Sequence, residues 1–244
     1  MDFMTLLAIF CLLMVAVAFS PLGLGGGILY VPIMHYMLDW EIKEAIVASL
    51  TLVLMVSLGS SLAHSKSGHA DHRVAKWGRI AAVPSATIGV LLSGVLLSLV
   101  GDVGIKILAA LVITFVLERT IRKSVAHTVE YTEETLLEKR NQYLTGSSFA
   151  GIAAGVLGIG GGAILVTLNR SMLKMDAKKA AGTSYLVAAT IVPVALLSHL
   201  VINQNLDVIV DNSGIVAMFL VPLMVFASAF FGAKYAIKYL PKHI

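Results

Sequence analysis

The sequence predicts an all-α polytopic membrane protein, and its composition and long uncharged runs lead to this fold class. Of the 244 residues, 58% are hydrophobic and 13% are charged, with a mean hydropathy of +0.89. Soluble domains carry about 25% charged residues. A helix needs about 20 apolar residues to cross a bilayer, and most of the uncharged runs reach that length. The runs are 3–38, 45–63, 80–101, 107–117, 180–206 and 212–233.

The first run is interrupted by glycines in the stretch "PLGLGGGILYVP". Each glycine weakens a helix by about 1 kcal/mol relative to alanine. Irregular backbone is tolerated at membrane depth only where it lines a cavity or is buried in protein. The run lacks the basic start of a secretory signal and is roughly twice as long as the apolar part of one. We therefore interpret 3–38 as mature structure.

The interruption occurs twice, because the chain contains an internal duplication. The segment "GLGGG" at 23–27 returns as "GIGGG" at 158–162, an offset of 135 residues. In this register 12 of the 42 positions from 23 to 64 are identical to their partners. Self-similarity at a fixed offset indicates two copies of one structural unit.

The duplication divides the chain into a first transmembrane repeat at 1–117, a cytoplasmic connector at 118–142 and a second repeat at 143–244. The connector balances five basic against five acidic residues. The first repeat includes a fourth hydrophobic segment at 103–117, whereas the second ends at "KYLPKHI". The counterpart of the fourth segment would begin there, so we expect the last helix of the second repeat to be missing.

The basic residues predict how the repeats face. If both glycine-broken blocks dip into the membrane and return, as re-entrant or discontinuous helices, 16 of the 18 Lys and Arg residues share one side. Only Lys43 and Lys106 lie opposite. Single crossings of every block would divide the basic residues evenly. Because basic loops are cytoplasmic, we expect 64–79, 118–142 and 170–179 in the cytoplasm of a cell (inner) membrane protein. The repeats are then inverted.

Inverted repeats with broken helices hold the substrate near the midplane in many transporters. A break frees backbone N–H groups and starts a new helix, and both features favour an anion. The alternative interpretation is close helix packing, which also favours small residues. The candidate substrate-binding glycines are Gly25, Gly26 and Gly27 in the first break and Gly160, Gly161 and Gly162 in the second.

Hydroxyl side chains follow each break, early in the next hydrophobic segment. Ser49 and Ser184 are equivalent in the duplication, with Thr51 and Thr183 beside them. Their hydroxyl groups are able to donate hydrogen bonds to an oxyanion. Alternatively, serine and threonine in such helices bond the backbone one turn back.

A histidine pair, His64 and His199, ends the same helix in each repeat. Histidine titrates near neutral pH, so the pair is a candidate for gating or proton transfer, and the alternative is an interfacial histidine facing headgroups.

We expect no metal site, because no further ligand lies within a helical turn, and the single cysteine, Cys11, excludes a disulfide framework. All 14 Asp and Glu residues lie outside the hydrophobic blocks, which favours an anion bound by neutral donors and leaves H⁺ or Na⁺ coupling open.

Together these residues resemble the sulfite exporter TauE/SafE family, also called the TSUP anion permeases. The resemblance covers nearly the whole chain and rests on "GLGGGILYVP", "GIGGGAILV", "AIVASLTLVL", "AAGTSYLVAA" and "HSKSGHADHRVAKWGRIAAVPSATIGVLLSG". It implies a transporter of sulfite, thiosulfate, sulfoacetate or a similar sulfur-containing or organic anion. At Pro21 the family usually has a small residue, so a stiffer first break is expected here.

The leading hypothesis is a secondary transporter that works by alternating access, with a small anion and the lipid bilayer as partners and with no cofactor or nucleic acid. An anion channel is the alternative, because the sequence does not separate channel from carrier. An intramembrane enzyme is disfavoured, because Ser49 and His64 lie 15 residues apart on one helix, about 22 Å along its axis. The direction of transport and the oligomeric state stay open.

Overall fold

The computed structural model describes residues 3–124, 133–203, 210, 212 and 214–239, and all regular structure within them is α-helical. Residues 125–132 of the predicted connector and the end of the C-terminal tail lie outside the described residues. The predicted first repeat, 1–117, contains α1 (Phe3–Phe19), α2 (Gly27–Met37), α3 (Ile42–Lys66) and most of α4 (His72–Ser124), which continues into the predicted connector. The connector also contains α5 (Glu133–Glu138) and the start of α6 (Arg140–Leu157), and the predicted second repeat contains the rest of α6, α7 (Gly162–Ser171), α8 (Ala177–Asn203) and α10 (Ile215–Tyr239).

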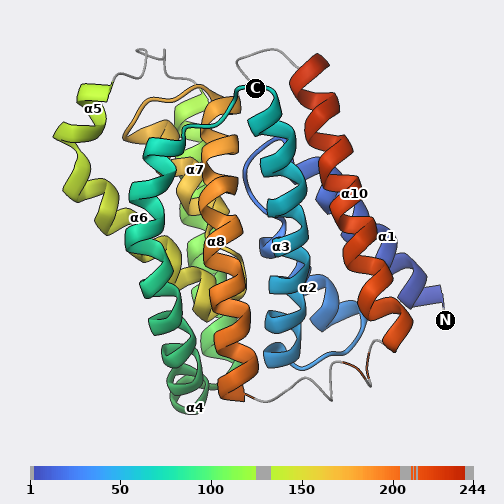
Figure 1. Cartoon of the computed structure of the whole chain (residues 1–244). Helices are drawn as coiled ribbons and strands as arrows, with labels where there is room; N and C mark the ends of the chain where they lie inside the picture. Colours follow the sequence, from blue (N-terminus) through green and yellow to red (C-terminus); the bar gives the residue numbers. More distant parts are fainter. Residues whose placement is uncertain (1–2, 125–132, 204–209, 211, 213, 240–244) are drawn as a thin grey trace.

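Four of the described helices, α3, α4, α8 and α10, are long and apolar enough to cross a membrane. Helix α4 is two arms joined at Gly101, whose backbone is non-helical (φ 61°, ψ −170°). The first arm descends and the second returns upward in Figure 1. The hydrophobic segment 103–117 therefore lies in the second arm, which runs in the opposite direction to the first arm.

Two interruptions separate α1 from α2 and α6 from α7. Each interruption contains three glycines with positive φ: Gly23, Gly25 and Gly26 in the first, Gly158, Gly160 and Gly161 in the second. Each member of the first set lies 135 positions before its partner in the second. Left-handed backbone is disfavoured for residues with a Cβ. The duplicated glycines therefore explain why α1 and α6 end before these interruptions and why α2 and α7 begin after them.

Helices that the duplication pairs, α3 with α8 and the first arm of α4 with α10, run in opposite directions (Figure 1). In Figure 1, α3 rises through the centre of the bundle while its counterpart α8 descends beside it, and α10 rises where the first arm of α4 descends. The packing partners also correspond, because α1 packs on α10 as α6 packs on α4, and α3 packs on α10 as α8 packs on α4.

The seam between α4 and α6 is built from small residues. A methyl group added at Gly151 would overlap the carbonyl group of Ala82, and one added at Gly89 would overlap that of Ile152. Such close backbone approach is a common mode of helix packing in membranes. Large apolar side chains point outward instead, including Phe10 on α1 and Phe231 on α10.

The basic segments gather at one end of the bundle, which we call the basic end. Lys178 Nζ donates to the carbonyl of Ile237 at 2.9 Å, and Lys139 Nζ donates to that of Met172 at 3.3 Å. Arg140 stacks on the ring of Trp77, with 4.3 Å between the guanidinium carbon and the ring centroid. These contacts join the start of α8 to the end of α10, and the start of α6 to the end of α7 and to α4.

The other end of the bundle contains Lys43 and Lys106. Lys43 begins α3 there, and Lys106 lies 5.3 Å from the centroid of the Tyr36 ring. Asn212 donates to Glu44 Oε2 at 2.9 Å. Among the described residues, Lys139, Arg140, Lys178 and Lys179 therefore share the basic end, and Lys43 and Lys106 lie at the opposite end.

Candidate functional site

The two glycine breaks meet inside the bundle. A methyl group at Gly27, the first residue of α2, would lie 2.9 Å from the carbonyl oxygen of Gly158. In the same way, a methyl group at Gly162, the first residue of α7, would lie 2.8 Å from the carbonyl oxygen of Gly23. The two contacts are equivalent in the duplication. The structure therefore brings together the two triple-glycine motifs, which lie far apart in the sequence.

Both helix starts are buried and lack a capping side chain. The residues before α2 and α7, Gly26 and Gly161, adopt left-handed backbone and make no side-chain cap hydrogen bond. Every residue from Gly158 to Thr167 is buried. The first N–H groups of a helix have no partner within it, and together they carry about half a positive charge. Two such positive ends thus adjoin in a buried region.

Ser49 and Ser184 each hold the break of the other repeat. Ser49 Oγ donates to the carbonyl of Gly158 at 3.0 Å, and Ser184 Oγ lies 3.3 Å from the carbonyl of Gly23 and 2.8 Å from that of Ala181. The structure places both predicted serines at the breaks. The Ser49 hydroxyl is directed to a break carbonyl, whereas the Ser184 hydroxyl is shared between the Gly23 carbonyl and the closer Ala181 carbonyl.

The two threonines make other contacts. Thr51 donates to the carbonyl of Val47 at 3.3 Å, one turn back on α3. Thr183 accepts a hydrogen bond of 2.9 Å from the backbone N–H of Asp71 at the basic end. Neither hydroxyl is bonded to a break in this structure, so only the serines among the predicted hydroxyl residues are found there.

The histidines lie against the segments that precede the breaks. His64 Nε2 is 3.4 Å from the carbonyl oxygen of Ser20, and His199 Nε2 is 2.7 Å from that of Gly155. Ser20 and Gly155 are again equivalent positions. Both imidazoles are buried, with 0% and 2% of the residue exposed, so they do not face headgroups. A carbonyl only accepts, so each Nε2 donates.

Four further polar residues surround the first break, and sequence reasoning missed them. Tyr185 Oη donates to the carbonyl of Phe19 at 2.7 Å and lies 3.4 Å from the amide nitrogen of Gly25. The other three are Tyr30, Ser57 and Ser60, all fully buried. The spacing of Ser57, Ser60 and His64 on one helix was a usable signal, but these serines have no identical partners in the second repeat.

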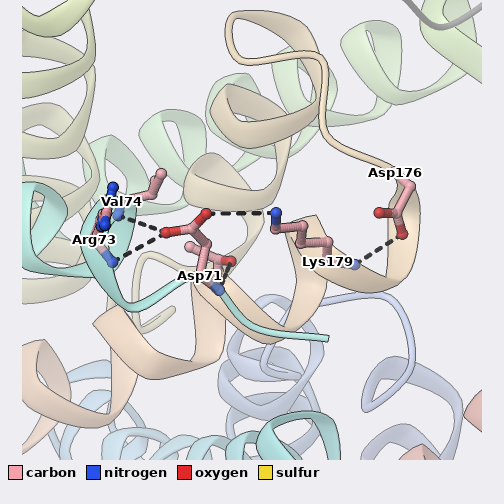
Figure 2. A network of polar contacts seen from close by, with 6 residues as sticks. Asp71, Arg73, Val74, Asp176 and Lys179 are labelled. Atoms are coloured by element: carbon pink, nitrogen blue, oxygen red, sulfur yellow. Dashed lines mark hydrogen bonds and ion pairs between the residues drawn. The ribbon is translucent and has the colours of Figure 1, made fainter. Parts of the chain in front are cut away.

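A polar network covers the basic end, as Figure 2 shows. Asp71 Oδ1 accepts from the amides of Arg73 and Val74 at the start of α4, at 3.0 and 3.1 Å. Its other oxygen, Oδ2, lies 3.5 Å from Lys179 Nζ on α8. The Lys179 amide donates to Asp176 Oδ1 at 3.0 Å. The network thus joins the α3–α4 loop to the start of α8.

The hydrogen bond between Asn212 and Glu44 is the counterpart of this network at the other end, because Glu44 and Lys179 are equivalent in the duplication. Each bundle end is therefore tied by a polar contact between the first turn of a central helix and the loop beside it. Within the described part of the chain, no group of three or more His, Cys, Asp or Glu residues is placed to hold a metal ion.

Comparisons with known proteins agree with this architecture. The sequence profile of a family described as "Sulfite exporter TauE/SafE" matches residues 7–244. A protein of Methanocaldococcus jannaschii described as a probable membrane transporter is 24% identical over 241 residues, which cover 92% of this chain and 84% of that protein. No solved structure matches the chain.

Proposed function

Because the chain belongs to the sulfite exporter TauE/SafE family, and is thus a multi-pass membrane transporter, we propose that it is a secondary transporter of a small sulfur-containing or organic anion. Sulfite, thiosulfate and sulfoacetate are the candidate substrates. The protein works by alternating access, and the anion binds where the two glycine breaks meet.

The observation that carries this proposal is the meeting of two uncapped helix starts. The N-termini of α2 and α7 adjoin through the Gly27–Gly158 and Gly162–Gly23 contacts. Each helix start contributes about half a positive charge and several free N–H donors. Together they offer an anion roughly one compensating charge without a charged side chain. A small anion bound this way leaves the site more readily than one paired with a buried lysine or arginine.

Ser49 and Ser184 belong to the proposed site as the groups that hold the break carbonyls. A carbonyl oxygen repels an anion, so a hydroxyl that keeps it turned away favours binding. The hydrogen bonds from Ser49 to Gly158 and from Ser184 to Gly23 support this role. Thr51 and Thr183 are proposed to act less directly, through the α3 backbone and the basic end.

Inverted orientation of the repeats is part of the proposal. The opposite directions of α3 and α8 in Figure 1 support it. The gathering of basic segments supports a cytoplasmic basic end, because basic loops are retained in the cytoplasm. If the two halves exchanged their conformations, the breaks would be exposed first to one side of the membrane and then to the other.

The polar ties at the bundle ends are proposed to close the pathway in the present state. Asp71 with Lys179 closes the basic end, and Glu44 with Asn212 closes the opposite end. If one of these polar contacts broke while the other remained, the pathway would open to one side of the membrane. His64 and His199, which contact Ser20 and Gly155, would follow that movement as gating residues.

Flux into liposomes tests the proposal. Purified protein in sealed vesicles should take up radiolabelled sulfite or thiosulfate, with saturation and with accelerated exchange against internal anion. Imposed H⁺ or Na⁺ gradients identify the coupling ion. Uptake that neither saturates nor shows counterflow would mean a channel. Absence of flux and of binding for every anion tested, with correctly folded protein, would overturn the proposal.

A further inference from the structure

Unpartnered polar atoms are concentrated beside the first break. Among the described residues, six buried side-chain polar atoms have no hydrogen-bond partner, and four of them are Tyr30 Oη, Ser57 Oγ, Ser60 Oγ and His64 Nδ1. All four residues are 0% exposed. A buried hydroxyl without a partner is unfavourable, so native proteins rarely retain one unless a ligand or water binds it.

Three of these residues lie on one face of α3 that is directed at the first break. At 100° per residue, Val53, Ser57, Ser60 and His64 fall within about 60° of one another around the helix axis. Val53 lies between the two breaks, because a methyl group at Gly25 would lie 3.4 Å from its Cγ1 and one at Gly160 would overlap it. His64 contacts Ser20, just before the first break. Val192, the counterpart of Ser57, contacts Gly160 of the second break, so Ser57 is directed in the same way at Gly25 of the first, with Ser60 between it and His64.

The tyrosines cover this stripe from two other helices. The Tyr30 side chain folds back along α2, and a methyl group added at Gly26 would lie 2.8 Å from its Oη. Tyr185 on α8 binds the break through Phe19 and Gly25. Its ring centroid is 6.1 Å from that of His64. Hydroxyl groups from α2, α3 and α8 thus surround one side of the first break.

The second break lacks these groups. The positions equivalent to Tyr30, Ser57, Ser60 and Tyr185 are, in the same order, Leu165, Val192, Ala195 and Leu50. The second break nevertheless has the same glycine conformations and the same serine and histidine contacts. The fold of a break therefore does not require the hydroxyl groups found at the first one.

We infer that the transported anion is coordinated asymmetrically, with its oxygens bound at the first break by the hydroxyl groups of Tyr30, Ser57 and Ser60. This inference rests on the proposed function. The positive end of α2 supplies the compensating charge at the same place. Several converging neutral donors suit a compact anion with several acceptor oxygens, such as sulfite or a sulfonate, better than a halide with no directional oxygens.

Removal of the hydroxyl groups at the first break tests the inference. The variants are Ser57→Val with Ser60→Ala, Ser60→Ala alone, and Tyr30→Phe. Ser147→Ala on α6 is the matched control, because Ser147 Oγ is also buried and unpartnered but lies outside the cluster. Sulfite and thiosulfate binding is measured by calorimetry on detergent-purified protein, with thermal unfolding as the check of folding.

We expect the double variant and Tyr30→Phe each to weaken anion binding at least tenfold, and Ser147→Ala to change it less than twofold. Unchanged binding in both cluster variants, with wild-type binding and transport intact, would overturn the inference and leave the proposed function standing. Absence of binding and transport in the wild-type protein would overturn both. The single Ser60→Ala variant decides the matter if the double variant does not fold.

Discussion

The two glycine breaks share one backbone and differ in the side chains around it. Both have three left-handed glycines, a contact from a serine of the other repeat, and a histidine that contacts the segment before the break. The first break is surrounded by hydroxyl groups and the second by aliphatic side chains. The comparison teaches that the duplicated residues build the breaks, whereas the residues that differ are the ones that we propose to determine what each break binds.

The largest expected effect comes from filling the contact between the breaks. Gly27→Ala places a methyl group 2.6 Å from Ile159 Cα, a backbone atom that is unable to move aside. Gly162→Ala meets the carbonyl oxygen of Gly23 at 2.8 Å. We expect losses of about 2–3 kcal/mol in the free energy of unfolding, measured by denaturant titration in micelles, with the larger loss at Gly27.

Gly94→Ala is the control for this pair, because nothing lies within 4 Å of a methyl group added there. It should leave stability unchanged or raise it by up to about 1 kcal/mol, since alanine favours a helix over glycine. If Gly27→Ala were as stable as Gly94→Ala, the breaks would not be packed against each other as described.

The serine pair should give the next largest effect and sharpen the comparison. Ser49→Ala leaves the buried Gly158 carbonyl without its donor, at an expected loss of about 2 kcal/mol. Ser184→Ala should lose less, about 1 kcal/mol, because that hydroxyl is shared with the carbonyl of Ala181 in its own helix. Equal losses, measured by thermal unfolding of the two single variants, would contradict the unequal geometry.

Substitutions of the two histidines should affect protein stability and anion affinity in opposite orders. His199 makes the shorter contact, 2.7 Å against 3.4 Å for His64. We therefore expect His199→Leu to be less stable than His64→Leu by about 1 kcal/mol. Anion affinity, measured on the same two proteins, should fall more for His64→Leu, because His64 belongs to the first-break cluster. The opposite order of affinities would place the anion at the second break.

The polar ties at the bundle ends should give the smallest effects on stability. The Lys179 side chain is 33% exposed, so Lys179→Ala should cost at most about 0.5 kcal/mol. Its counterpart Glu44 is only 8% exposed and accepts from Asn212, and Glu44→Ala should cost about 1 kcal/mol. Thermal unfolding of both variants checks this order, and a larger loss at Lys179 would reverse the comparison between the ends.

The helical class is the part that the sequence predicted best. Uncharged runs of span length form helices in lipid, where every backbone polar group needs an internal partner, and the repeated glycines mark positions where left-handed backbone is easily adopted. The placement of Ser49 and Ser184 at the breaks also agrees with their equivalence in the duplication. Their acceptors, the Gly158 and Gly23 carbonyls, depend on packing between distant segments and have no local signal.

The residues that sequence reasoning missed share a physical reason. Ser57, Ser60, Tyr30 and Tyr185 differ between the repeats, whereas the search for a site relied on positions that are identical in both. Apolar membrane helices commonly contain serine and tyrosine, so these residues stood out only once burial and missing hydrogen-bond partners were known. Thr51 was predicted as a donor to the anion, but it bonds the Val47 carbonyl of its own helix.

The exchange of serines between the repeats also bears on how the protein is made. The Gly23 carbonyl is held by Ser184, 161 residues later, and the Gly158 carbonyl by Ser49, 109 residues earlier. A ribosome has therefore synthesised the first break long before the helix that fixes it exists, while the second break meets its serine as soon as it emerges. During most of translation the first break therefore lacks the Ser184 contact, and each repeat depends on the other for one hydrogen bond at its break.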